Sequence, residues 1–346
     1  MFFHKLLQIP VEREKNFIKL SYFEVDLVTL ICPTLNEEGY IENVLRFFVN
    51  SSPVDKELYI IDGGSQDKTK EIVKKWQSTN NKIFLFENSD KYVPFALNIG
   101  INHSSGDPII RLDAHTEYSD DYILKILEIF NRTNADIVGG PMNPVGKSSF
   151  QNAVSFATMS KFGIGGSKIH DIHYDGYTDH VYLGAWRRNI FNEIGYFDTL
   201  LIRNQDDEFD YRAKSKGKKI FQSHEIKSFY YPRSNILLLI KQYYQYGLFK
   251  PLVLRNVPSE MKIRHIIPAL FGLYFLMLFI PLFKSLIFFV PLIMYLVTNL
   301  FFSFINSEKL PIKLILPIIF SVIHLSYGYG FILGLGYLIK HEKRQE

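Results

Sequence analysis

Short apolar runs alternate with helical patterns between residues 26 and 140. The runs that predict strands are 27–32, 58–61, 82–86, 108–112 and 135–138. Helical patterns lie between them, at 36–49, 69–76, 93–102 and 120–131. Strands that alternate with helices are typical of βαβ units, so this part of the chain predicts an α/β domain.

The alternation weakens after residue 140. The segment 163–180 is rich in Gly, His, Asp and Tyr and is expected to be a long loop, which in a compact domain usually serves function. Helical patterns resume at 188–194, 207–216 and 236–246. The last of these is apolar and aromatic, with Lys241 and Lys250 at its edge, which suits a helix at a membrane surface.

Charged residues become scarce between Arg264 and Lys340. Three apolar stretches fill this tail, at about 266–283, 285–305 and 312–339. Because roughly 20 helical residues cross a bilayer core of about 30 Å, we expect three membrane segments. A buried core helix is the alternative for any one of them. The first is slightly short, and the last is long enough to tilt or to contain a re-entrant turn.

The N-terminal extension, residues 1–25, has too short an apolar run for a secretory signal and no small-residue cleavage site. Basic residues precede the first apolar stretch, namely Lys250, Arg255, Lys262 and Arg264. By the positive-inside rule they predict that the domain before these stretches lies on the cytoplasmic side of a multi-pass cell-membrane protein. Three spans would place the basic terminal residues outside, against the same rule; these are Lys340, His341, Lys343 and Arg344. Either one stretch is re-entrant or interfacial, or the first spans alone determine the orientation.

Composition excludes some classes of function. Cys32 is the one cysteine, which excludes an intramolecular disulfide and a multi-cysteine metal site, and its apolar surroundings predict a core position. The formal net charge is +4 with no concentrated Lys/Arg stripe. A nucleic-acid partner is therefore not expected, whereas anionic lipid or a diphosphate suits the modest positive balance.

Two carboxylates follow predicted strands. Asp62 ends the second, and Asp113 follows the fourth. Ligands of α/β sheets bind at the carboxyl ends of strands, so we expect both to face one cleft. Gly63 and Gly64 would let a ligand approach the backbone beside Asp62, although a plain turn is the alternative.

Asp113 and His115 lie two residues apart and can share one side of an extended segment. Together with diphosphate oxygens they suit Mg²⁺ or Mn²⁺, the alternative being an unrelated surface pair. Asp206 is crowded by Asp207 and Glu208, and such crowding raises proton affinity, which favours a general base. An acidic helix start is the alternative there.

Six motifs occur in an order that resembles family 2 glycosyltransferases, most of all the membrane-anchored, succinoglycan glycosyltransferase-like branch. They are Pro33–Glu38, Asp62–Thr69, Ala96–Gly100, Asp113–His115, Gly195–Asp198 and Gln205–Glu208. The resemblance covers roughly residues 26–250. It implies a GT-A-type nucleotide-diphospho-sugar transferase domain with a mostly parallel central sheet, split into a nucleotide and metal half (26–140) and an acceptor half (141–250). An interfacial linker (251–265) and the membrane segments (266–340) would follow.

The resemblance also implies roles for individual residues. Nucleoside contacts would come from Pro33, Thr34, Asn36, Glu37 and Asp62, and metal ligands from Asp113 and His115. Asp206 would be the catalytic base, with Asp207 or Glu208 in support because Gln205 replaces the family's Glu. Acceptor contacts are expected from Gly184, Ala185, Gln242 and Tyr246.

The expected activity is inverting, metal-dependent transfer of one sugar in cell-surface polysaccharide biosynthesis. The donor would be a nucleotide-diphospho-sugar, UDP-linked sugars being favoured, and the acceptor a lipid-linked or growing glycan. Gln245 and Tyr246 stand where processive synthases carry Arg and Trp, which argues against processive synthesis. The alternatives are a polyprenyl-phosphate glycosyl synthase and a catalytically silent membrane scaffold with the same fold.

Overall fold

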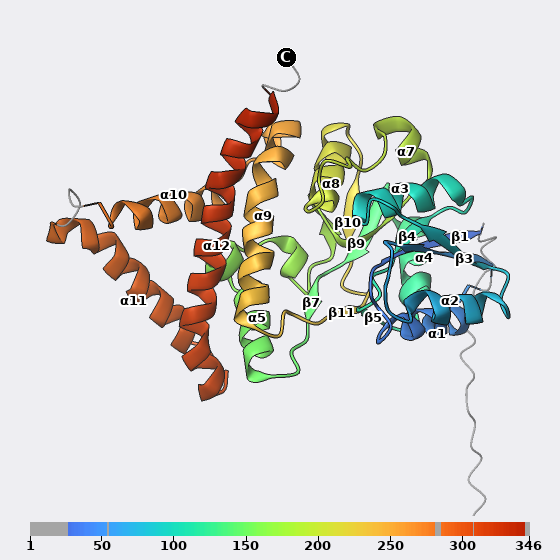
Figure 1. Cartoon of the computed structure of the whole chain (residues 1–346), viewed down its shortest axis with the longest axis horizontal. Helices are drawn as coiled ribbons and strands as arrows, with labels where there is room; N and C mark the ends of the chain where they lie inside the picture. The colour runs from blue at the N-terminus through green and yellow to red at the C-terminus, as the bar shows by residue number, and fades with distance from the viewer. Residues whose placement is uncertain (1–26, 54, 281–284, 307, 343–346) are drawn as a thin grey trace, which may run out of the picture.

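The computed structural model describes residues 27–53, 55–280, 285–306 and 308–342. The extension expected at 1–25, together with Lys284, Lys343 and Arg344, lies outside the described residues. A sheet domain forms one side of the molecule and long helices form the other (Figure 1).

The main sheet has the strand order β3-β2-β1-β4-β9-β6-β10-β8. Its members are β1 (Val28–Thr34), β2 (Lys56–Asp62), β3 (Ile83–Glu87), β4 (Ile109–Arg111), β6 (Ile137–Gly140), β8 (Gly176–Tyr177), β9 (Tyr182–Trp186) and β10 (Ile220–Gln222). Neighbouring strands among β1 to β4 pair in parallel, as do β6 and β10, whereas β9 runs antiparallel between β4 and β6. The expected α/β fold with a mostly parallel sheet is confirmed.

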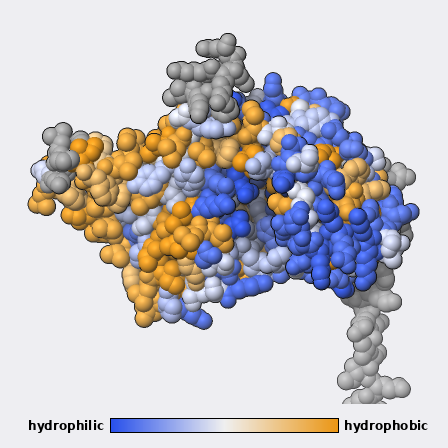
Figure 2. All heavy atoms as spheres, in the orientation of Figure 1, coloured by the Kyte–Doolittle hydropathy of each residue, from blue (hydrophilic) through white to orange (hydrophobic). Residues whose placement is uncertain are grey.

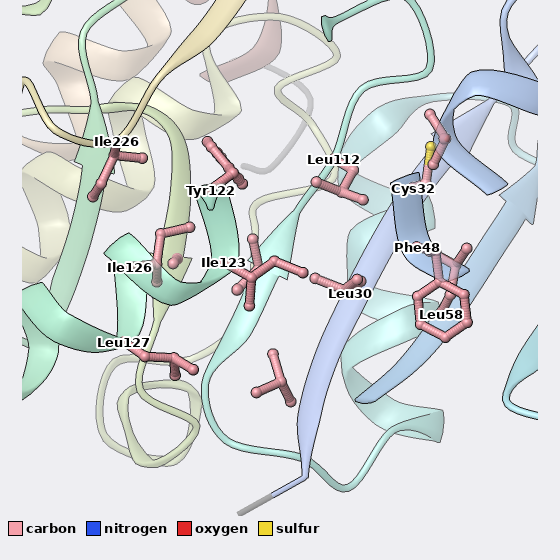
Figure 3. Packing of buried hydrophobic residues seen from close by; sticks show 14 of the residues in the cluster. Leu30, Cys32, Phe48, Leu58, Leu112, Tyr122, Ile123, Ile126, Leu127 and Ile226 are labelled. Atoms are coloured by element: carbon pink, nitrogen blue, oxygen red, sulfur yellow. The ribbon is translucent and has the colours of Figure 1, made fainter. Parts of the chain in front are cut away.

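Helices cover both faces of the sheet. They are α1 (Ile41–Asn50), α2 (Thr69–Gln77), α3 (Val93–His103), α4 (Tyr122–Arg132), α7 (Asn189–Ile194) and α8 (Gln205–Ser215). Successive strand residues point to opposite faces, so Leu30 and Cys32 pack with α1 and α4 while Ile31 packs with α3 and α8. Figure 3 shows the first of these two cores, in which Cys32 is fully buried as expected.

The sequence pattern weakens between residues 141 and 184, but the structure contains regular elements there, some of them within the loop expected at 163–180. The segment contains β7 (Asn143–Pro144), α5 (Ser149–Met159), α6 (Lys161–Ile164) and the 3₁₀ turn η1 (Lys168–His170). Strand β7 joins a small second sheet with β5 (Glu117–Tyr118) and β11 (Ser228–Tyr230). The apolar face of α5 packs against a helix more than 150 residues away along the chain, so no local pattern marks its partner.

Helix α9 (Ile236–Asn256) is longer than the helix expected at 236–246. The domain boundary placed at residue 250 therefore falls inside it. Its first turn exposes several apolar side chains, of which Leu237 is 73% exposed. The 3₁₀ turn η2 (Pro258–Glu260) links α9 to the apolar tail.

The apolar tail forms α10 (Ile263–Met277), the 3₁₀ turn η4 (Leu286–Phe289), α11 (Val290–Phe304) and α12 (Leu310–Glu342). Within the described residues two stretches are long and apolar enough to cross a membrane, Leu286–Phe304 and Leu310–Leu338. Helix α10 has 15 residues, about 22 Å, and runs across α12 rather than along it (Figure 1). This geometry favours the interfacial alternative for the first of the three expected segments.

Helix α12 is built into the sheet domain rather than attached as a separate anchor. It lies beside α9 (Figure 1), and Leu316, Ile319 and Phe320 of α12 share one buried cluster with α5 and α9. His324 of α12 also hydrogen-bonds the carbonyl oxygens of Phe162 and Gly163 in α6, at 2.8 and 3.1 Å. The tail and the sheet domain therefore share packing that fixes their relative position.

Candidate active site

A cavity of about 1320 Å³ opens between the carboxyl ends of β1 and β4 and the long helices. Figure 2 shows the surface hollowed there, between the hydrophobic helices and the hydrophilic sheet domain. The cavity brings together many of the residues singled out from the sequence: Pro33, Thr34, Glu37, Asp113, His115, Asp206, Asp207, Gln242 and Tyr246. Parallel strands end at the same edge of the sheet, which is why positions far apart in the chain meet here.

Asp62 does not face the cavity, contrary to the expectation that both strand-end carboxylates would do so. It is fully buried, and its carboxylate accepts from the backbone N–H of Gly64 and of Ser65, at 2.9 and 2.8 Å. The hydroxyl of Ser65 donates to it at 2.6 Å. The short Asp side chain satisfies the N–H groups of its own turn, so the turn alternative describes its geometry.

Asn36 is also absent from the cavity lining. Its side-chain oxygen accepts from the backbone N–H of Gln66 at 2.9 Å, while its own N–H donates to the Ser65 hydroxyl at 2.8 Å. Asn36 has a left-handed backbone (φ 56°), which Asn tolerates better than most residues. Asn36 and Asp62 thus join the loops after β1 and β2, and the nearby Thr34 and Glu37 reach the cavity.

Three other residues expected at the site lie elsewhere. Gly184 and Ala185 are inside β9, and Ala185 is fully buried. A β-carbon on Gly184 would lie 2.8 Å from the Trp186 ring, so packing within the sheet explains the glycine. Glu208 is 1% exposed and pairs with Arg212 one helical turn later, at 2.8 Å. None of the three lines the cavity.

Asp113 and His115 both reach the cavity with partly exposed side chains. The Nδ1 of His115 lies 3.1 Å from the Glu37 carboxylate, and this hydrogen bond raises the pKa of His115. In the neutral ring, Nδ1 donates to Glu37 and leaves the Nε2 lone pair available, as in metal sites where a carboxylate orients a histidine.

Among the described residues, no group of three His, Cys, Asp or Glu side chains converges on one point. Asp113 and His115 fit a cation that takes its remaining ligands from a diphosphate and water, as Mg²⁺ commonly does.

Arg111 lies between two carboxylates of the cavity, those of Asp113 and Asp206. Its Nε donates to Asp113 at 2.9 Å and its Nη2 donates to the other oxygen at 3.2 Å, while Nη1 lies 3.6 Å from Asp206. Burial lowers the pKa of Arg111, but Asp113 and Asp206 outweigh it and raise that pKa, so the guanidinium stays charged. Sequence reasoning did not assign Arg111 a role, although a cation ending an apolar run was the available signal.

Asp206 lies in the first turn of α8, one residue after the helix begins. Its side chain is 38% exposed and lines the cavity. The preceding Asn204 adopts a left-handed conformation (φ 59°), and its side-chain amide donates to the Tyr246 carbonyl of α9 at 2.9 Å. This contact fixes the start of α8 against α9, where Gln242 and Tyr246 also face the cavity.

Asp207 belongs to a buried charge network rather than a crowd of like charges. It pairs with Lys250 of α9 and lies 3.1 Å from His180, which also contacts Asp210 at 2.7 Å. Burial lowers the pKa of His180, but the two carboxylates outweigh it and raise the pKa to about 9. Burial opposes the ionised form of Asp207, yet Lys250 and His180 lower its pKa. The prediction that crowding by like charges raises proton affinity is therefore wrong for Asp207, whose pKa is lowered by its cationic partners.

Lys250 was expected to flank a membrane segment, and it is instead 6% exposed and bonded to Asp207. Lys262 pairs with Asp179, and Arg264 lines the cavity. Of the four cations that the positive-inside rule relied on, only Arg255 is both exposed and outside the cavity lining and these ion pairs. These four residues therefore give weaker support for a cytoplasmic orientation of the sheet domain.

The loop between β3 and α3 contributes cavity residues that the motifs did not reveal, including Asn88, Asp90 and Lys91. Lys91 has a left-handed backbone (φ 66°) and packs against Gly63, where an added β-carbon would lie 3.3 Å from it. A second group comes from the long segment after α6, from Gly165 to His170 and from Thr178 to His180. That segment was expected to be functional, and the structure places both of its ends in the cavity wall.

Comparison with known proteins identifies the fold and the family. The family model "Glycosyl transferase family 2" matches residues 29–195. The succinoglycan biosynthesis protein ExoA of Rhizobium meliloti (strain 1021) is 33% identical over 221 residues, covering 63% of this chain and 67% of that protein. The chain belongs to glycosyl transferase family 2. It is a glycosyltransferase.

A second relative of this family 2 glycosyltransferase matches over more of the chain. It is the dolichyl N-acetyl-alpha-D-glucosaminyl phosphate 3-beta-D-2,3-diacetamido-2,3-dideoxy-beta-D-glucuronosyltransferase of Methanococcus voltae, which is 28% identical over 321 residues. The match covers 90% of this chain and 98% of that protein, so it includes part of the apolar tail. Among solved structures, the mannosyltransferase PcManGT from Pyrobaculum calidifontis, in complex with GDP-Man and Mn²⁺, has a TM-score of 0.58 at 16% identity over 88% of this chain and 87% of that one. That likeness concerns the fold.

Proposed function

We propose that this glycosyltransferase moves one sugar from a nucleotide-diphospho-sugar to a lipid-linked glycan acceptor, with inversion at the anomeric carbon. The observation that carries the proposal is the shared cavity. Glu37, Asp113 and Asp206 line its polar end, and side chains of α10, α11 and α12 line its other end. A cavity with both kinds of wall suits a polar donor and an acceptor attached to a lipid.

The donor would lie at the carboxyl ends of β1 and β4, against Pro33, Thr34 and Glu37. UDP-linked sugars are the favoured class. Asp113 and His115 would hold Mg²⁺ or Mn²⁺, and a cation bound there offsets the negative charge of the diphosphate leaving group. The fold neighbour PcManGT was solved in complex with GDP-Man and Mn²⁺, which supports a divalent cation.

Asp206 would act as the general base. It accepts the proton of an acceptor hydroxyl, whose oxygen forms a bond to the anomeric carbon as the bond from that carbon to the diphosphate breaks. The products are the glycosylated acceptor and the nucleoside diphosphate. Attack on the face opposite the leaving group inverts the anomeric carbon. The proximity of Arg111 keeps the Asp206 carboxylate in place beside Asp113.

The acceptor side is supported by the tail. The Methanococcus voltae relative is named for transfer to a dolichyl-phosphate-linked sugar, and its match extends over 90% of this chain. Gln242 and Tyr246 of α9 would contact acceptor sugar, since an amide and a phenol ring can hydrogen-bond to it and stack on it. The enzyme would be a multi-pass cell-membrane protein with its catalytic domain in the cytoplasm, working in surface polysaccharide assembly.

The test is transfer by the full-length protein in detergent, with a panel of nucleotide sugars, Mn²⁺ and a polyprenyl-phosphate-linked sugar. Asp206→Asn should lower kcat roughly 10²–10⁴-fold, the usual contribution of a general base, and leave donor binding unchanged in a thermal-shift titration. Asp120→Asn is the matched control, because Asp120 is exposed and outside this cavity.

Two outcomes would contradict the assignment. Equal loss of donor affinity in Asp206→Asn would make Asp206 a donor-binding residue rather than a base. Full activity of Asp206→Asn toward a polyprenyl phosphate acceptor would instead favour a polyprenyl-phosphate glycosyl synthase, because a phosphate acceptor needs no general base.

A further inference from the structure

Lys161 and Arg264 are two of the cations in the cavity wall that have no acidic partner among the described residues, and they lie where the wall meets the apolar helices. Lys161 begins α6, and Arg264 lies in the first turn of α10. Both line the cavity, and neither forms an ion pair within the part of the chain that the structure describes. Arg264 lies close to Tyr211 of α8, the helix that carries Asp206, so this guanidinium lies between the polar end of the cavity and the apolar helices.

Two acidic residues of the same wall, Asp179 and Asp207, already have cationic partners. Asp179 pairs with Lys214 at 2.7 Å and also with Lys262. Asp207 pairs with Lys250 and His180. The charges of Lys161, which is exposed, and of the half-buried Arg264 therefore remain uncompensated, and two uncompensated cations beside one cavity favour an anionic ligand.

A glycine turn lies between the two cations. Gly165 and Gly166 have successive left-handed backbones, with φ of 76° and 66°. A β-carbon on Gly165 would lie 2.8 Å from the Cβ of Arg264, and one on Gly166 would lie 3.4 Å from the Cγ of Lys161. The backbone N–H of Gly166 has no acceptor among the described residues. Two cations and an unsatisfied N–H around one turn provide donors of the kind that phosphate oxygens accept.

Apolar side chains continue from this point along the helices. Ile267 and Phe271 follow Arg264 on α10 at helical spacing, and Ile323 of α12 belongs to the same cavity lining. Ile267 is 56% exposed. The wall thus passes from polar, at Asp206, through the cations to apolar, which is the order of groups in a glycan joined through phosphate to a hydrocarbon chain.

We propose that Lys161, Arg264 and the Gly165–Gly166 turn bind the phosphate of a polyprenyl-phosphate-linked acceptor, whose hydrocarbon tail leaves along Ile267, Phe271 and Ile323. This site rests on the proposed function, because it defines the acceptor of the same reaction. It is separate from the donor region, where Asp113 and His115 would meet the diphosphate. A free phosphate ion would make no use of the apolar wall, so the geometry favours a lipid phosphate.

The experiment measures binding to the full-length protein in detergent by thermal shift, independently of turnover. The probes are a short-chain polyprenyl phosphate, the polyprenol of the same length and inorganic phosphate. Polyprenyl phosphate should raise the Tm at concentrations where the other two do not. Arg264→Gln and Lys161→Gln should each raise its half-saturating concentration roughly tenfold, since a charged hydrogen bond contributes about one such factor. Arg264→Lys should retain part of the binding.

Arg255→Gln is the matched control, an exposed basic residue of α9 that lies outside the cavity lining. It should bind polyprenyl phosphate like the unaltered protein. Nucleotide-sugar shifts should be unchanged in all variants, and the acceptor KM should rise in Arg264→Gln with the donor KM constant. Retained donor binding also shows that a variant is folded, and Arg264→Lys provides a gentler change if Arg264→Gln is unstable.

Several results would overturn the site. These are unchanged polyprenyl phosphate binding in both Gln variants, equal binding of polyprenol, equal binding of inorganic phosphate, and loss of donor binding that tracks loss of lipid binding. Asp206→Asn separates the two proposals, because it should lower kcat roughly 10²–10⁴-fold and keep the lipid shift. Absence of transfer by the unaltered enzyme, with an Arg264-dependent lipid shift, would refute the proposed reaction and leave the phosphate site standing.

Discussion

The guanidinium of Arg111 lies 3.6 Å from the carboxylate of Asp206, the proposed base, and also binds both oxygens of Asp113. One planar cation therefore sets the separation between the proposed base and the proposed metal ligand. Lys carries a single charged centre and cannot make these contacts together. Arg111 is thus a positioning residue whose geometry matters as much as its charge.

Arg111→Lys should lower kcat by about 10–100-fold and change the Tm far less than Arg111→Ala, which leaves the carboxylates of Asp113 and Asp206 without this cation. Steady-state kinetics measure the change in kcat, and thermal unfolding in detergent measures the change in Tm. Arg132→Lys is the control, because Arg132 pairs with Glu225 on the surface of the sheet domain. Wild-type kcat in Arg111→Lys would show that charge alone is needed.

Glu37 should act on metal affinity through His115. Glu37→Gln removes the carboxylate that orients the ring at 3.1 Å, and changes to such partners usually weaken metal binding 10–100-fold. The concentration of Mn²⁺ that gives half-maximal activity should rise, and a thermal shift with Mn²⁺ and nucleotide should weaken in parallel. Glu38→Gln is the neighbouring control, since Glu38 is outside the cavity lining. An unchanged Mn²⁺ requirement in Glu37→Gln would remove His115 from the metal site.

Asp62 tests whether a strand-end carboxylate acts on the ligand or on the fold. Asp62→Ala leaves the N–H groups of Gly64 and Ser65 without their acceptor, which should lower the free energy of unfolding by roughly 2–4 kcal/mol. Asp62→Asn keeps an acceptor oxygen and should lose much less. Thermal unfolding and donor titration distinguish the two roles, because direct nucleoside contact would instead give Asp62→Asn a loss of donor affinity at unchanged stability.

The sheet could be predicted from the sequence because strand and helix periodicity is a local property. The five expected strands all form, and the ordered acidic motifs located the edge of the sheet that carries Asp113. Side-chain direction was not predictable in the same way. Asp62 and Asp113 both follow strands, yet the turn N–H groups after Asp62 take up its carboxylate. The role of Lys250 depends on Asp207, 43 residues away, and no local pattern records that pairing.

His180 should make stability depend on alkaline pH. Its pKa is raised to about 9 in the folded protein, above an ordinary value of about 6.5. A raised folded pKa stabilises fully below the unfolded pKa, and that stabilisation is lost as pH rises through the folded pKa. The free energy of unfolding, and with it the Tm, should therefore fall as pH rises from about 6.5 to about 9, with a total loss of roughly 1–3 kcal/mol.

His180→Gln supplies the reference for this measurement, since other groups titrate in both proteins. The difference in Tm between the two should shrink as pH rises across this window. His103→Gln is the control, because His103 is exposed at the end of α3. A difference that stays constant from pH 7 to pH 10 would mean that His180 is uncharged at neutral pH.

Helix α12 should depend on glycine where it meets α9. A β-carbon on Gly330 would lie 2.1 Å from the carbonyl oxygen of Tyr244, and one on Gly247 would lie 2.1 Å from that of Tyr327. Glycines allow such close backbone approach between apolar helices. Gly330→Ala must push α9 away from α12, which should lower the free energy of unfolding by about 1–3 kcal/mol.

Because α9 also carries Gln242 and Tyr246, the same shift should raise the acceptor KM more than the donor KM. Gly336→Ala is the control on the same helix: nothing lies within 4 Å of a β-carbon there, so its Tm should be unchanged or slightly higher. Thermal unfolding and two-substrate kinetics measure both effects. Equal Tm values for the two alanine variants would show that α9 and α12 do not pack closely at Gly330 in solution. The positions of Gln242 and Tyr246 could not then depend on this contact.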